Sequence, residues 1–125
     1  MPRYCHYMIE IAELVWDNNG RKIAPNGGVM RTSFVGVHMF WNLDEVKENA
    51  LKFVRITHFD PRCQASAVAV SIAIATMLQG KHKDKKGQFS VKDIIKDCYH
   101  YASECLETNE QKKELKTFLN CTNIK

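Results

Sequence analysis

The sequence lacks the features that mark secreted and membrane-spanning proteins. Its five cysteines form an odd set with no CxxC pair, whereas a secreted disulfide framework normally has an even number. No apolar segment typical of a signal peptide follows the first residues. The longest apolar stretch, residues 65–78, is too short to cross a bilayer. These absences predict an intracellular, cytoplasmic protein with no membrane partner.

A strong charge of either sign is also missing. The 18 Lys and Arg against 14 Asp and Glu leave a net charge of +4 over 125 residues. Much of that excess lies in residues 81–86, a run without an aromatic side chain on which a base could stack. We interpret the run as a solvated loop rather than a nucleic-acid-binding surface, and expect no nucleic-acid partner. The composition, 45% hydrophobic and 26% charged, is that of one globular domain.

Helical periodicity and capping patterns predict an all-α protein with about six helices. Apolar residues recur at helical spacing over residues 3–16. Capping patterns open further helices at Asn42, Ser90 and Thr108. Another helix is expected from residue 62 to Gly80, and its many small residues would let neighbouring helices approach its backbone closely. We expect this to be the central helix, and no segment predicts a strand convincingly.

Residues 29–41 are the ambiguous segment. They are apolar nearly all round, which suits a buried helix, although their β-branched and aromatic content is also typical of a strand. We favour the helix because of the length of the segment and because two glycines, Gly27 and Gly28, precede it.

The first of two candidate ligand-binding loops is residues 24–32, which contains Asn26, Gly27, Gly28 and Arg31. The glycines would let backbone N–H groups turn toward a phosphate at the start of the predicted helix. Arg31 could add positive charge there, or instead lock the loop by bonding to carbonyl groups. The alternative is that Pro-Asn-Gly forms an ordinary tight turn.

The second loop, residues 57–63, places His58 at the end of one helix and Cys63 at the start of the next. His58 could donate to a ligand hydroxyl or a phosphate, or it could only cap the free carbonyls of the preceding helix. We expect Asp60 and Arg62 to pair across the turn. Cys63 is interpreted as a small buried residue rather than a nucleophile.

Taken in order, the two loops resemble the central part of the ADP-ribosylglycohydrolase family. There the pattern Pro-Asn-Gly-small-x-Met-Arg is followed, after a helix-length gap, by Thr-His-x-Asp-Pro-x-Cys. The likeness extends over about residues 16–80, and more faintly through the helix after Ser90. It implies an all-α, orthogonal multi-helix fold like the middle part of the family fold, with residues 1–125 forming a single partial domain.

The resemblance also implies a ligand. Members of the family hydrolyse the glycosidic bond of ADP-ribose with a pair of magnesium ions, so the expected partner is ADP-ribose or an ADP-ribosylated protein. Matching positions assign ligand contacts to six residues: Asn26, Gly27, Gly28, Met30, Arg31 and His58. At Gly28 the family more often has Ser or Ala, so one side-chain contact is absent from this sequence.

The carboxylate ligands of the family's magnesium ions have no counterpart in this sequence. They come from a Thr-Asp-Asp motif early in the domain and an Asp-x-Asp-Thr motif near its end, and neither occurs here. A hard divalent cation needs several oxygen ligands that converge on one point. We therefore expect no catalytic residue and no metal ligand in this chain. Three hypotheses stay open: an inactive fragment of an ADP-ribosylglycohydrolase, a non-catalytic ADP-ribose-binding module, and a helical interaction protein.

Overall fold

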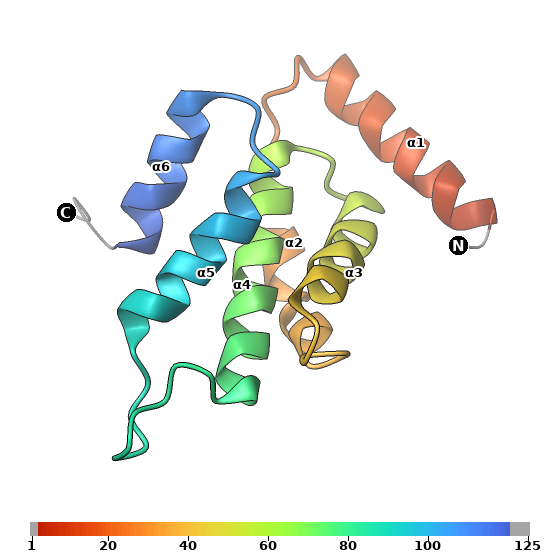
Figure 1. Ribbon diagram of the computed structural model, residues 1–125. Coiled ribbons are helices and arrows are strands. Elements are labelled where there is room, and N and C mark those ends of the chain that lie inside the picture. Colours follow the sequence, from red (N-terminus) through yellow and green to blue (C-terminus); the bar gives the residue numbers. More distant parts are fainter. Residues whose placement is uncertain (1–2, 121–125) are drawn as a thin grey trace.

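The structure, a computed structural model, describes residues 3–120 and consists of helices joined by loops (Figure 1). Its α-helices are α1 (Arg3–Asn18), α2 (Gly27–Met30), α3 (Leu43–Arg55), α4 (Pro61–Gln79), α5 (Val91–Ser103) and α6 (Asn109–Leu119), and a 3₁₀ helix, η1, spans Ser33–Gly36. The described residues contain no strand, only an isolated bridge between Lys83 and Phe89. The predicted all-α, multi-helix fold is confirmed.

Helix α4 is the central element, with α3 and α5 packed on either side of it (Figure 1). Small residues along α4 let its neighbours come close to its backbone. Gly36 of η1 lies so close to this helix that an added Cβ would be 2.5 Å from the carbonyl oxygen of Ser71. The helix ends at Gly80, whose φ of 67° is the left-handed conformation that glycine adopts at low cost. The predicted central helix is confirmed.

Helix α4 is also long and apolar enough to cross a membrane by length and composition alone. It exceeds the apolar run of residues 65–78 because Pro61, favoured at a first helical position, starts it earlier. However, 61% of its 18-residue apolar window is buried inside the fold. That burial is typical of a helix at the centre of a helical core.

The core lies where α3, α4 and α5 meet. Its buried side chains include Val46 and Leu51 of α3, Val68 and Ile72 of α4, and Ile94 of α5, joined by several alanines and Cys98.

The helix starts largely follow the sequence patterns. Asn42 and Thr108 accept hydrogen bonds from the backbone N–H groups of Glu45 and Gln111. Ser90 lies at the N-cap position of α5, where the sequence predicted a helix start, but its side chain makes no capping bond to the backbone.

The buried helix predicted for residues 29–41 is wrong. The chain instead forms the single turn α2, then η1, then turns in which Met39 has a φ of 54°. Thr32 Oγ1 donates to the carbonyl oxygen of Val29, and such local bonds compete with the α-helical ladder. In η1 only Val35 and Gly36 are buried. Four of the large apolar side chains are exposed, namely Met30, Phe34, Val37 and Trp41, and three are half-buried, namely Val29, Met39 and Phe40.

Helix α1 is confirmed as a helix, but its apolar face is not packed against the core. None of its residues is buried, and it lies at the edge of the molecule (Figure 1). Its last turns make the contact with the rest of the fold. Trp16 Nε1 donates to Asp60 Oδ2 at 2.9 Å, and the Trp16 ring lies 5.7 Å from that of Phe59.

Asp60 joins α1, the second loop and α4. Its carboxylate, 2% exposed, accepts from Trp16, from the Arg62 backbone N–H and from the Arg62 guanidinium at 3.0 and 3.1 Å. The same guanidinium donates to the carbonyl oxygen of Lys22. The predicted pairing of Asp60 with Arg62 is confirmed. Burial by itself would raise the pKa of Asp60, but the hydrogen bonds from Arg62 and Trp16 outweigh it, so the pKa is lowered.

We predict that Asp60→Asn lowers the free energy of unfolding at pH 7 by about 1–3 kcal/mol, because the amide cannot form the charged hydrogen bonds to Arg62. The wild-type Asp60 pKa is lower in the folded state than in the unfolded state. The carboxylate therefore makes its full contribution to the free energy of unfolding at pH values above its unfolded-state pKa of about 3.9. This contribution is lost as the pH falls through the lower pKa of the folded state.

Urea titrations at pH 7 and at pH 3 measure both effects. The asparagine variant should lose less stability than wild type between these two pH values. Glu48→Gln, a change at an exposed position of α3, serves as the control and should behave like wild type. A wild-type stability and pH profile for Asp60→Asn would contradict the prediction.

Candidate functional site

The structure brings the two candidate loops against each other. Gly27 and Gly28, which form the first turn of α2, pack on the ring of His58. A Cβ added to Gly27 would lie 3.4 Å from His58 Nε2, and one added to Gly28 would lie 3.2 Å from His58 Cγ and 3.0 Å from Val54 Cγ2. Glycine is therefore needed at position 28 for close packing between the loops. These two residues and His58 are among the six that were predicted to contact a ligand.

Arg31 is tied to the second loop through Thr57. Its guanidinium donates to Thr57 Oγ1 and lies 5.4 Å from the centre of the Phe53 ring. Thr57 Oγ1 in turn lies 2.8 Å from His58 Nδ1. Of the two roles considered for Arg31, the structure supports the locking of a loop, although the acceptor is a hydroxyl group and not a carbonyl. Arg31 is exposed, so its charge also faces solvent.

The surroundings of His58 favour its neutral form. Burial lowers the pKa of the imidazole, and the nearby positive charge of Arg31 lowers it further. Because Thr57 Oγ1 accepts a hydrogen bond from Arg31, its own hydrogen can be donated to Nδ1. The neutral ring then carries its hydrogen on Nε2, the atom beside Gly27. His58 can therefore donate to a ligand from this nitrogen. At the end of α3, the backbone N–H of His58, and not its imidazole, donates to the carbonyl oxygen of Val54 at 2.8 Å.

The helix expected to support a phosphate at the first loop is much shorter than predicted. With four residues, α2 is a single turn, and the dipole of a long helix is absent. The side chain of Asn26 makes no capping bond to it, and Met30 is 77% exposed. Asn26 and Met30 thus lie at the surface on the two sides of the glycines, apart from the contact with His58.

A small hollow lies beside His58. It has a volume of about 60 Å³, whereas pockets that enclose a drug-sized ligand measure about 300–1,000 Å³. One wall comes from α1 and the other from the two loops, and the lining residues are Ala12, Val15, Trp16, Ile23, Pro25, Thr57, His58 and Phe59. A hydroxyl group or the oxygens of one phosphate fit this volume, whereas a whole nucleotide does not.

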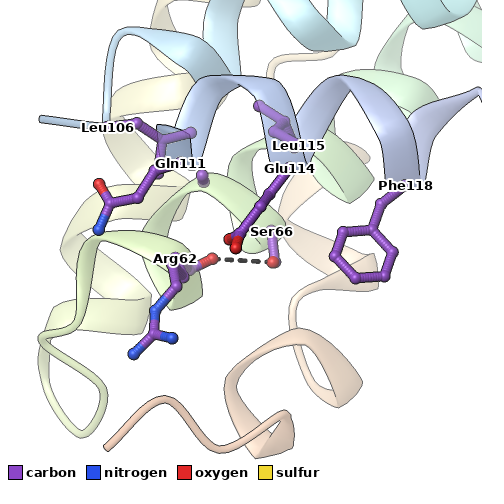
Figure 2. A pocket seen from close by; sticks show the side chains of 8 residues that line it. Arg62, Ser66, Leu106, Gln111, Glu114, Leu115 and Phe118 are labelled. Atoms are coloured by element: carbon purple, nitrogen blue, oxygen red, sulfur yellow. Dashed lines mark hydrogen bonds between the residues drawn. The ribbon is translucent and has the colours of Figure 1, made fainter. Parts of the chain in front are cut away.

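A different hollow separates the start of α4 from α6 (Figure 2). It measures about 100 Å³ and includes the apolar side chains of Leu106, Leu115 and Phe118. A wider depression of about 690 Å³ adjoins it and shares Arg62, Glu114 and Phe118. None of the six predicted ligand-contacting residues lines either one. The Arg62 guanidinium at their edge is already bonded to Asp60 and to the Lys22 carbonyl.

Cys63 behaves as a structural residue, as the sequence predicted. Its thiol is buried and lies 3.3 Å from the Pro25 carbonyl oxygen, to which it donates. Burial, with a smaller contribution from the charge of Asp60, raises the pKa of the thiol to about 11. At neutral pH the thiolate that a nucleophile needs is therefore scarce. The contact instead fixes the first loop to the start of α4.

The described residues do not fit the pair of magnesium ions that the family resemblance implies. No three His, Cys, Asp or Glu side chains within residues 3–120 are grouped so that they could hold a metal ion. Several carboxylates are already paired: Asp17 with Arg21, Asp60 with Arg62, and Asp97 with His82. Mg²⁺ needs converging oxygen ligands in near-octahedral geometry, and this part of the chain offers none.

We predict that Gly28→Ala lowers the free energy of unfolding by about 1–2 kcal/mol, because the new methyl group must displace Val54 or the His58 ring. Gly27→Ala is the matched control. Its Cβ would meet only the His58 ring, at 3.4 Å and beyond, so its effect should be under about 0.5 kcal/mol. Urea unfolding measures the stabilities, and the imidazole proton resonances of His58 report the displacement. Equal effects of the two alanines would contradict the packing described here.

Comparison with known proteins supports the family resemblance of the two loops. A sequence model of the ADP-ribosylglycohydrolase family matches residues 6–120, which is nearly the whole chain and includes both loops. No curated protein and no solved structure matches the chain significantly. On the strength of the family match, the chain belongs to the ADP-ribosylglycohydrolase family.

Proposed function

We propose that this ADP-ribosylglycohydrolase-like chain contacts ADP-ribose through its two loops and does not hydrolyse it on its own. The observation that carries the proposal is the packing of Gly27 and Gly28 on the ring of His58. The two segments that resemble the family's ligand-contacting loops thereby form one surface. Family membership supports ADP-ribose or an ADP-ribosylated protein as the partner.

The groups at this surface suit a nucleoside diphosphate. The exposed guanidinium of Arg31 offers positive charge and further N–H donors to phosphate oxygens. The Nε2–H of neutral His58 can donate to a ribose hydroxyl or a phosphate oxygen. Gly27 is half-buried beside His58 and has no side chain of its own to keep a ligand away from its backbone.

The small hollow limits the affinity. Its volume of about 60 Å³ encloses only a fraction of ADP-ribose, so most of the bound ligand would stay in contact with water. We therefore expect a dissociation constant of roughly 0.1–1 mM.

We expect the chain to remain inactive as a hydrolase because the carboxylates for a divalent cation are missing from its sequence motifs. The buried surroundings and the Arg31 charge also lower the pKa of His58, so the residue is a poor source of protons for a departing group at neutral pH. Recognition of the ligand, rather than cleavage, is what these residues can supply.

The cysteines support a location inside the cell. The four that the structure describes, Cys5, Cys63, Cys98 and Cys105, are all free thiols, which persist in a reducing compartment.

The binding proposal predicts that titration of the chain with ADP-ribose, followed by amide chemical shifts, shows saturable changes at residues 26–31 and 57–58. Gly27→Val should weaken binding several-fold, because a branched side chain would press on His58 and block the backbone. His58→Ala should also weaken it, because the Nε2 donor is lost. Asp84→Ala, in the lysine-rich loop of residues 81–86, is the control and should bind like wild type.

Circular dichroism of each variant checks that its helices are intact. Undetectable binding by wild type, or equal binding by wild type and both loop variants, would leave the loops with a structural role only.

The inactivity proposal predicts no release of ADP-ribose from an ADP-ribosylated protein when the isolated chain and magnesium are added, beyond the release in a chelator control. A complete member of the family, assayed in parallel, verifies the substrate. Release that the chelator abolishes would refute the proposed inactivity without affecting the binding proposal.

A further inference from the structure

Helix α1 carries a continuous apolar surface that nothing in the described chain covers. Six of its large side chains are between 43% and 70% exposed: Tyr4, Tyr7, Met8, Ile11, Leu14 and Val15. We call these six residues the outer stripe. Their spacing of three and four residues places them along one face of the helix.

Except for Val15, which also lines the hollow beside His58, the outer stripe lies away from the side by which α1 attaches to the molecule. Ile9, Ala12 and Trp16 are half-buried, and Trp16 holds α1 to Asp60 and Phe59. The apolar surface of α1 is therefore wider than its attachment to the molecule requires, and it continues onto the solvent side of the helix. The polar residues occupy only the remaining face: Arg3, His6, Glu10, Glu13 and Asp17. An apolar seam that repeats over two heptads is the pattern of a helix that packs against a second helix.

The size of the outer stripe agrees with an interface. At the exposures given above, and with about 150–250 Å² for a large side chain, the six residues present roughly 600 Å² to solvent. This lies at the upper end of the largest apolar patch on a typical monomer, about 300–600 Å². Two such stripes together would bury roughly 1,200 Å², which is the lower limit of specific protein–protein interfaces.

We propose that two copies of the chain associate through their α1 helices, with the outer stripes packed face to face in an antiparallel pair. A twofold arrangement lets one self-complementary surface cover both copies. In Figure 1, α1 lies at the periphery of the molecule, so a second copy can approach its outer side.

The charges that flank the stripe select the antiparallel direction. Arg3 lies at the beginning of α1 and Asp17 near its end. Both residues lie on the same edge of the stripe, and antiparallel helices bring like edges together, so each Arg3 approaches Asp17 of the other copy. Parallel helices bring opposite edges together, and Arg3 would then face the edge that carries Met8 and Val15, where no charge can pair with it. Glu10, near the middle of the same edge, meets its own counterpart in the antiparallel pair, and this one like-charge contact opposes the two Arg3–Asp17 pairs. Exposed pairs of this kind set orientation more than affinity.

Sedimentation velocity of the full chain over a range of concentrations tests the association. We predict a reversible change from the 14.4 kDa monomer to a species of twice that mass, with a dissociation constant on the order of 10 µM for so small an interface. A monomer at all concentrations up to about tenfold above that value would overturn the proposal, as would assembly into larger species without a dimer plateau.

Leu14→Lys should weaken the association at least tenfold, because it places a charge in the stripe. Val91→Lys is the matched control, since it makes the same kind of change at a residue of α5 that is 65% exposed, and it should dimerise like wild type. Circular dichroism verifies that both variants keep their helices. Equal dimerisation of Leu14→Lys and wild type would show that another surface is responsible and would overturn the proposal.

The orientation is tested by exchanging charges. Arg3→Glu and Asp17→Arg should each weaken the dimer several-fold, and the double variant should recover most of the loss. The pair between Asp17 and Arg21 within one chain is lost in both Asp17→Arg and the double variant, so it cannot account for a recovery. A double variant weaker than both single variants would refute the antiparallel arrangement.

Discussion

The buried carboxylate of Asp60 is the interaction on which the arrangement of this molecule depends. It begins α4 by accepting from the Arg62 backbone, and it holds α1 through Trp16. Through the Arg62 guanidinium it also reaches the Lys22 carbonyl, just before the first loop. The thiol of Cys63 adds a bond to Pro25 from the same helix start. The position of the first loop beside His58 thus follows from polar contacts gathered at one end of α4, where a buried charge must be fully bonded.

The parts of the fold that depend on local chemistry could be predicted from the sequence. Caps at Asn42 and Thr108 and the left-handed Gly80 need only neighbouring residues, and they formed as expected. The failure at residues 29–41 has a tertiary cause. An apolar segment predicts burial, but in this segment only Thr32, Val35 and Gly36 are buried, and local hydrogen bonds then favour turns over a helix. In α1 the periodicity predicted the helix correctly, yet it contains no information about which surface the helix meets.

In the candidate site, too, the residues could be predicted from the sequence but their tertiary contacts could not. The family pattern identified the glycines, Arg31 and His58, but their relation lies in contacts between residues about 30 positions apart. Thr57, which joins Arg31 to His58, was not singled out as a site residue, although it is the first residue of the Thr-His-x-Asp-Pro-x-Cys pattern. The sequence also did not reveal that α2 is a single turn, because the glycines serve close packing on His58 and do not open a long helix.

These contacts also connect the proposed site to the surface of α1. Ala12, Val15 and Trp16 form one wall of the hollow beside His58, and Val15 belongs to the outer stripe as well. Of that wall, Trp16 is fixed by its bond to Asp60, whereas Val15 is more than half exposed. A second helix packed on the stripe would restrict Val15 and exclude water from that edge of the hollow. Because a hydrogen bond from His58, which lines the hollow, strengthens as water is excluded, association through α1 would favour ligand binding at the loops. By linkage, a bound ligand would then favour the association to the same extent.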